Sequence, residues 1–171
     1  MTRLEQAGVM LLGLVAVGMG LRTMRRREDT AIDEIGTVIA TYRGPAAVCQ
    51  GISVVLVGLG IVAFAVAQLL GLGPVLEEHV RERPGIVIIP VSLAGLAWTM
   101  SLVFGTVEQR GSTWRLVSSV PARLLGLSLA VVSLAGLAVG LWDIVAPAAF
   151  EQAAHSVSAT VFPGQSPSPA R

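Results

Sequence analysis

The sequence contains no lysine and no asparagine, and it has one cysteine and two histidines in 171 residues. Without lysine the chain cannot anchor pyridoxal phosphate or retinal as a Schiff base or build a lysine-containing phosphate loop. Without asparagine it has no N-glycosylation site, and Cys49 alone cannot form an internal disulfide or a multi-cysteine metal site. Because the codons of both missing residues are rich in A, we expect a GC-rich, prokaryotic source.

Charge is also scarce. Only 13% of the residues are charged, whereas an average soluble domain has about 25%. The formal net charge of +1 argues against a nucleic-acid partner, and the mean hydropathy of +0.74 with 53% hydrophobic residues predicts that the partner is the lipid bilayer. We therefore expect an integral membrane protein.

Four apolar blocks are long enough, or nearly so, to cross a hydrocarbon core of about 30 Å, which requires roughly 20 helical residues. They predict an all-α fold: a bundle of four transmembrane helices within residues 1–147, with spans at about 4–21, 46–72, 86–107 and 124–146. The first block resembles a secretory signal in length, but Glu5 and the arginines that follow it favour a retained helix. Residues 148–171 form a polar tail that we expect to be disordered at its end, with room for a short interfacial helix over 148–154.

The arginines predict the orientation, because short cytoplasmic loops are enriched in basic residues. Five arginines lie in the first connection and three in the third, against four on the other side of the membrane. The chain is therefore expected in the plasma membrane with both termini outside.

Two of the connections carry patterns of their own. Between the first two spans, Ile32, Ile35, Ile39 and Tyr42 recur at helical spacing, which predicts a short amphipathic surface helix; the alternative is a solvated lead into the second span. In the second connection, His79 and Glu82 would share a helical face, but two ligands do not make a metal site, and we predict no bound metal.

Polar side chains within the spans are the candidates for a functional site, because they are costly in lipid. Asp143 lies one turn from the end of the fourth span. One interpretation is an interfacial carboxylate that reaches water at the headgroups. The other is a polar pocket that Asp143 forms with Gln68 and Ser92 in the outer half of the bundle. Pro90 in the third span should kink its helix unless its neighbours compensate.

Small residues recur every four positions on three spans, a spacing that favours close helix packing in lipid. The alternative is that glycine and alanine are simply frequent there. These predicted packing residues are Ala63, Ala67, Gly71, Ala97, Ser101, Gly105, Gly136 and Gly140. One heptapeptide, VSLAGLA, occurs at Val91–Ala97 and again at Val132–Ala138. An inverted repeat would explain it, but the flanks match poorly and coincidence is the simpler interpretation.

No sequence pattern for an enzyme is present: there is no GxSxG, HExxH, CxxC or glycine-rich phosphate loop. We therefore predict a non-enzymatic protein without cofactors. Two function classes remain. The first is a structural or accessory subunit that packs against other membrane helices, in a homo-oligomer or a larger complex; the alternative is a transporter or channel for a small solute or ion that uses the pocket of Gln68, Ser92 and Asp143.

Overall fold

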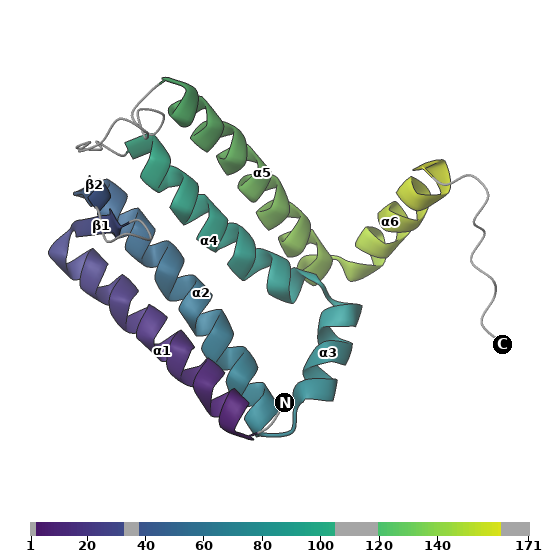
Figure 1. Ribbon diagram of the computed structural model, residues 1–171. Helices are drawn as coiled ribbons and strands as arrows, with labels where there is room; N and C mark the ends of the chain where they lie inside the picture. The colour runs from purple at the N-terminus through teal and green to yellow at the C-terminus, as the bar shows by residue number, and fades with distance from the viewer. Residues whose placement is uncertain (1–2, 33–37, 105–119, 162–171) are drawn as a thin grey trace.

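The computed structural model describes residues 3–32, 38–104 and 120–161 (Figure 1). In this part of the chain lie six helices and two short strands: α1 (Arg3–Arg26), β1 (Glu28–Ile32), β2 (Val38–Arg43), α2 (Pro45–Leu69), α3 (Gly73–Glu82), α4 (Gly85–Phe104), α5 (Val120–Val145) and α6 (Pro147–Val161). Four of the helices, α1, α2, α4 and α5, are long and apolar enough to cross a membrane. The prediction of four long apolar helices is therefore confirmed.

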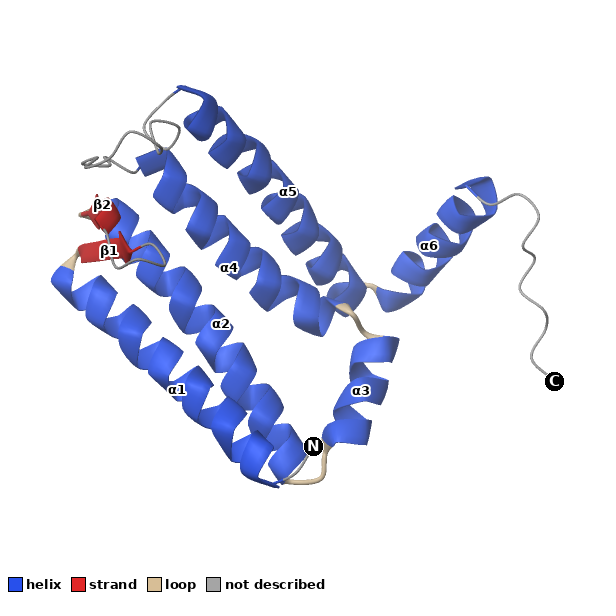
Figure 2. Ribbon diagram, in the orientation of Figure 1, coloured by secondary structure: helices blue, strands red, loops and turns tan. Residues whose placement is uncertain are grey.

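The four long helices run antiparallel and form two hairpins. α1 packs on α2, α4 packs on α5, and α2 joins the two hairpins by packing on α4. No other pair of long helices makes an extensive contact in the described residues, so the order in space is α1, α2, α4, α5 (Figure 2). The bundle is consequently open, and both of its broad faces remain uncovered by the described part of the chain.

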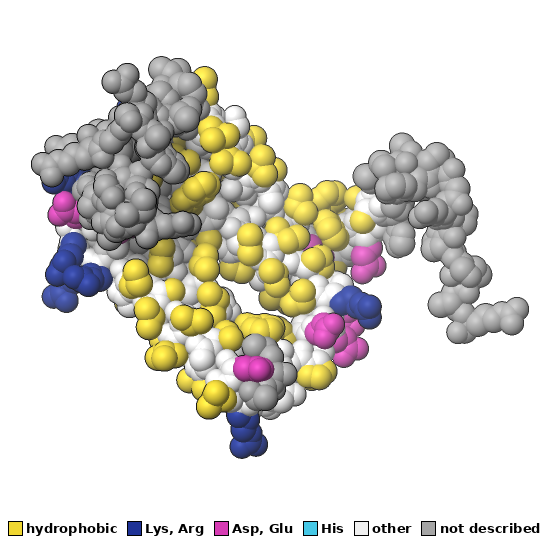
Figure 3. All heavy atoms as spheres, in the orientation of Figure 1, with side chains coloured by type: hydrophobic (Ala, Val, Ile, Leu, Met, Phe, Trp, Pro, Cys, Tyr) yellow, Lys and Arg dark blue, Asp and Glu magenta, His cyan; other side chains and the backbone are white. Residues whose placement is uncertain are grey.

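The interior contains small side chains, and the large apolar ones point outward. Among the residues whose burial is described, the buried hydrophobic ones are all alanines, and the largest fully buried side chains are those of Thr99 and Ser101. In the apolar stretch of each long helix, between 11% and 22% of the residues are buried. In Figure 3, hydrophobic side chains cover the helix bodies, and charged side chains lie near the helix ends. This distribution is the reverse of that in a water-soluble domain, where large apolar residues fill the core.

The structure corrects the prediction of an amphipathic helix after the first span. Residues 28–43 contain an antiparallel β-hairpin in which Glu28 pairs with Arg43 and Asp29 with Tyr42. The segment is rich in β-branched residues and contains the chain's one tyrosine, and such residues favour strands over helices. Their helical spacing was thus a weaker signal than their strand propensity. Ile35, one of the residues that suggested the helix, lies outside the described residues.

Side chains of both strands stabilise the β-hairpin near its base. The Arg43 guanidinium forms an exposed ion pair with the Glu28 carboxylate, at 3.3 Å from Nε to Oε1. Burial raises the pKa of the Tyr42 phenol above its ordinary value of 10.0, and the negative charge of Asp29 raises it further. The backbone N–H of Gly44 donates to the carbonyl of Arg27 at 2.9 Å and closes the hairpin where α2 begins.

The second connection and the tail both contain helices. α2 ends at Leu69, earlier than expected, because Gly71 adopts φ 71° and the N–H of Leu72 turns back to the Ala67 carbonyl at 2.8 Å. After α5, a helix is present where a short one was considered for 148–154; it is longer, as α6, and extends away from the bundle (Figure 1). The rings of Trp142 and Phe150 meet edge to face at 5.9 Å across the junction of α5 and α6.

Candidate functional site

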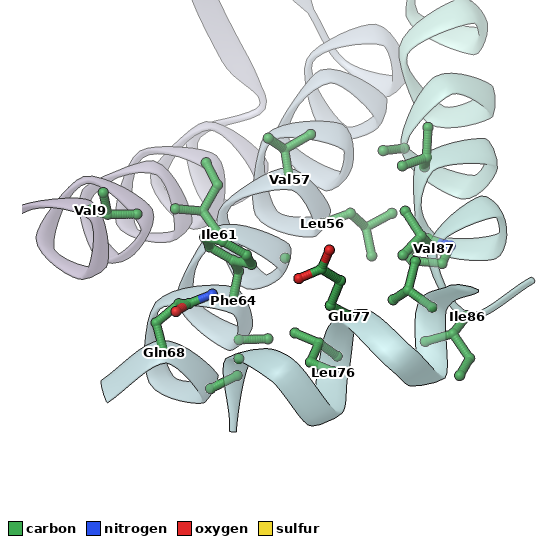
Figure 4. A pocket seen from close by; sticks show the side chains of 18 residues that line it. Val9, Leu56, Val57, Ile61, Phe64, Gln68, Leu76, Glu77, Ile86 and Val87 are labelled. Atoms are coloured by element: carbon green, nitrogen blue, oxygen red, sulfur yellow. The ribbon is translucent and has the colours of Figure 1, made fainter. Parts of the chain in front are cut away.

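A crevice lies between the two helical hairpins of the described structure. It has a volume of about 850 Å³, and its lining comes from one side of α2, the facing side of α4, one face of α3 and a single residue of α1, Val9 (Figure 4). Ligand sites in proteins typically have volumes of about 300–1,000 Å³ and mostly apolar walls with a few polar groups. We call this hollow the α2–α4 crevice.

Small residues on α2 and α4 leave room for the crevice. Ala63 and Ala67 of α2 and Ala94 of α4 line it, together with Pro90 and Val91. At the far end of the same two helices the gap closes. There the buried Ser101 hydroxyl of α4 lies 3.1 Å from the Gln50 side-chain oxygen of α2, and it also lies 2.6 Å from the carbonyl of Trp98. The two helical hairpins are thus in contact at the end of the bundle where the β-hairpin lies, and they separate toward α3.

Helix α3 bridges the open end of the crevice. It runs from the end of α2 to the start of α4 (Figure 1), and it contributes Gly73, Leu76, Glu77 and Val80 to the lining. These four positions are separated by three, one and three residues along the chain, so they lie on one face of the helix. The remaining charged residues of α3 are not among the lining residues.

Two polar side chains belong to the crevice. Glu77 is the one charged residue among the 18 described lining residues, and Figure 4 shows its carboxylate directed toward their middle. Gln68 lies near the end of α2, with its side-chain amide against the backbone of Gly73. A Cβ at Gly73 would stand 2.7 Å from the Gln68 side-chain oxygen. A ligand with an apolar body and one or two polar groups at one end would match this lining.

The structure separates the residues that were predicted to share a polar pocket. Gln68 lines the crevice, whereas Ser92 and Asp143 do not. Ser92 is buried between α4 and α5, where its hydroxyl occupies the space that a side chain at Gly136 would need. Asp143 is also at the α4–α5 contact, near the start of α4, and is 3% exposed.

Asp143 has a structural contact that explains its burial. Its Oδ2 atom accepts a hydrogen bond of 2.8 Å from the backbone N–H of Gly85, in the first turn of α4. The first N–H groups of a helix have no partner within the helix, and the helix dipole favours a carboxylate beside them. A side chain at Gly85 would collide with Asp143 and with the Gly140 carbonyl, so glycine is required for this close approach.

The predicted packing residues have different surroundings. Gly136 and Gly140 face α4, and Ser101 faces α2. Ala63 and Ala67 line the crevice, and Gly71 follows the end of α2. Ala97 is half-buried in α4, and Gly105 lies outside the described residues.

The close contact between α1 and α2 was missed at the level of the sequence. Gly13 and Gly20 of α1 oppose Gly58 and Gly51 of α2, and a Cβ at Gly20 would lie 2.7 Å from the carbonyl oxygen of Gly51. A side chain of the facing helix packs against each of these glycines, for example Val55 against Gly20. The available signal was a seven-residue glycine spacing on both helices, whereas the expected spacing was four.

The described residues contain no group of three or more potential metal ligands. His79 is engaged within α3, where its Nδ1 atom lies 2.9 Å from the carbonyl oxygen of Val75. Comparisons with protein-family models, with curated proteins and with solved structures find no match for this chain. The function of the chain must therefore be inferred from the geometry of the site.

Proposed function

We propose that this chain is a non-enzymatic accessory protein of the membrane, which acts by holding a membrane-embedded apolar ligand in the α2–α4 crevice. The observation that carries the proposal is the crevice itself, an apolar hollow of about 850 Å³ between two hairpins that are each tightly packed internally. The small residues Ala63 and Ala67 of α2 line this hollow. Their surface is thus available to another molecule.

The proposed location is the plasma membrane, with all four long helices crossing it. The outward-facing large apolar side chains and the small, partly polar interior support insertion, because helices in lipid associate through small residues and hydrogen bonds. With both termini outside, α3 and the open end of the crevice belong to the outer half of the membrane.

Cysteine labelling tests this orientation. In a Cys49→Ser background, a cysteine at Ser158 should react with a membrane-impermeant thiol reagent added to intact cells, and one at Thr113 should react only after the membrane is opened. The reverse pattern would place both termini inside.

Photo-crosslinking tests occupancy of the crevice. A photoreactive phenylalanine analogue at Val91, which lines the crevice and is 64% exposed, is compared with the same analogue at Val131 of α5, which is 66% exposed and outside the lining. In native membranes, position 91 should yield a discrete adduct that position 131 does not, and its mass separates a small ligand from a partner helix. Equal, diffuse lipid labelling at both positions would contradict the proposal.

A transporter is the second candidate, and the presence of Gln68 in the crevice favours it. Flux of a candidate solute into liposomes should then fall when Gln68 is replaced by leucine. Asp143 and Ser92 lie at the α4–α5 contact and not in the lining. Adding Asp143→Ala to Gln68→Leu should therefore lower the flux further only as far as it lowers the amount of folded protein.

A further inference from the structure

The feature that calls for an explanation is a carboxylate on the apolar face of α3. Leu76 and Val80 present apolar side chains to the crevice, and Glu77, which lies between them in the sequence, lines the same crevice. Glu77 and its neighbour Glu78 are both exposed to solvent, but only Glu77 lines the crevice. A charged residue on the inward face of an amphipathic helix departs from the usual pattern, and such departures are expected at functional positions.

The Glu77 carboxylate has no partner in the described part of the chain. The ion pair of Arg43 with Glu28 lies in the β-hairpin, and Glu77 makes no ion pair or hydrogen bond with a described residue. Although α3 carries Arg81, this arginine does not line the crevice. Any molecule that fills the crevice up to α3 will displace water from this carboxylate, and an unpaired carboxylate is costly to desolvate.

The occupant should therefore carry a positive charge at one end. We propose that the α2–α4 crevice binds an amphiphile with an alkyl chain and an ammonium group, the chain between α2 and α4 and the ammonium beside Glu77. This inference rests on the proposed function and specifies its ligand. Glu77 supplies the opposite charge, and the Gln68 amide at the same end of α2 supplies a neutral hydrogen-bonding group.

The lining also restricts the rest of the ligand. Apart from Gln68 and Glu77, its side chains are apolar or absent, so a ligand with polar groups along its length would lose hydrogen bonds on entry. A free long-chain amine and the headgroup of phosphatidylethanolamine share the required chemistry.

Two photoreactive probes test the proposal on the full chain in nanodiscs of phosphatidylglycerol, a lipid without an ammonium group. Both carry the same diazirine-bearing alkyl chain; one ends in a trimethylammonium group and the other in a hydroxyl. Labelling is mapped by mass spectrometry to peptides that contain the crevice residues of α2 and α4. The variants are Glu77→Gln and its matched control Glu78→Gln, which removes the same charge from the adjacent position outside the lining.

The ammonium probe should label the crevice about fivefold more than the hydroxyl probe, the ratio expected from a partly exposed ion pair. Glu77→Gln should abolish this preference, and Glu78→Gln should retain it. Equal labelling of the crevice by both probes, or equal loss of the preference in both variants, would overturn the ammonium inference and leave the proposed function standing. Absence of crevice labelling by either probe would overturn both.

The source of the ammonium group follows from repeating the measurement with phosphatidylethanolamine in the nanodiscs. If this lipid suppresses labelling of the wild type by the ammonium probe and not of Glu77→Gln, the natural ligand class is a lipid headgroup. If labelling of the wild type persists, the natural ligand class is a free amine. Either result requires the carboxylate of Glu77 as the recognition group.

Discussion

The close approach of α1 and α2 gives the sharpest prediction on stability. Substitution of Gly20 by alanine adds a Cβ that would lie 2.7 Å from both the Gly51 carbonyl oxygen and the Cγ2 atom of Val55. Because one of these neighbours is backbone, the helices must move apart to accept it. Gly18 lies on the same helix, and a Cβ added there would meet nothing within 4 Å, so Gly18→Ala is a matched control.

The control removes the effect of helix propensity from the comparison. Both substitutions replace glycine by alanine within a helix, which by itself stabilises by about 1 kcal/mol. Only Gly20→Ala overpacks the contact with α2, at a cost of about 1–3 kcal/mol. The free energy of unfolding should therefore be lower in Gly20→Ala than in Gly18→Ala by about 1–3 kcal/mol.

The assay uses the chain's one cysteine. Cys49 lies in the first turns of α2 and is half-buried, so its reaction with a maleimide during a titration with denaturing detergent reports the opening of this hairpin. Gly20→Ala should shift the midpoint to lower detergent concentration relative to Gly18→Ala. Coincident midpoints would show that the glycine contact does not determine the stability of the α1–α2 hairpin.

Three further predictions follow from named contacts. Asp143→Ala should lower the free energy of unfolding by about 1–3 kcal/mol, since the Gly85 N–H loses its acceptor; Asp143→Asn should restore most of it in the same titration, and equal losses would contradict the role. Because the raised pKa of Tyr42 favours the neutral phenol in the folded state, its contribution to hairpin stability is full below pH 10.0 and is lost as the pH rises through the raised pKa. Phenolate absorbance of this single tyrosine should titrate above 10.0, and Asp29→Asn should lower its pKa only partly, because burial is the larger cause; a titration at or below 10.0 would refute this. Ser101→Ala should cost about 0.6 kcal/mol, as for an average hydrogen bond between membrane helices, and a loss well above 2 kcal/mol would indicate a different role.

The long helices could be predicted from the sequence because their signal is local. Twenty consecutive apolar residues have one favourable arrangement in lipid, with every backbone group bonded within the segment. The segment after the first span has no such constraint. There a few isoleucines fit both a helical and a strand period. The segment forms a β-hairpin because its β-branched residues favour strands.

The site was less accessible to sequence reasoning because it depends on which faces meet. Gln68, Ser92 and Asp143 are all polar and all at similar depth in the expected spans, which suggested a shared pocket. The structure directs Ser92 and Asp143 toward the α4–α5 contact and leaves Gln68 on the crevice side. Glu77 was not among the predicted site residues, because residues 73–82 show a helical period only when they are taken as a helix that faces the bundle.

The length of α3 gives a physical reason for the crevice. Its ten residues span about 15 Å at 1.5 Å per residue, whereas packed helices lie only about 8–10 Å apart. A short loop would bring the end of α2 against the start of α4, but a helix laid between them holds them apart. At the other end of these helices, the contact of Ser101 with Gln50 holds them together. The two hairpins must therefore diverge toward α3, and the same helix that creates the opening also places Glu77 in it.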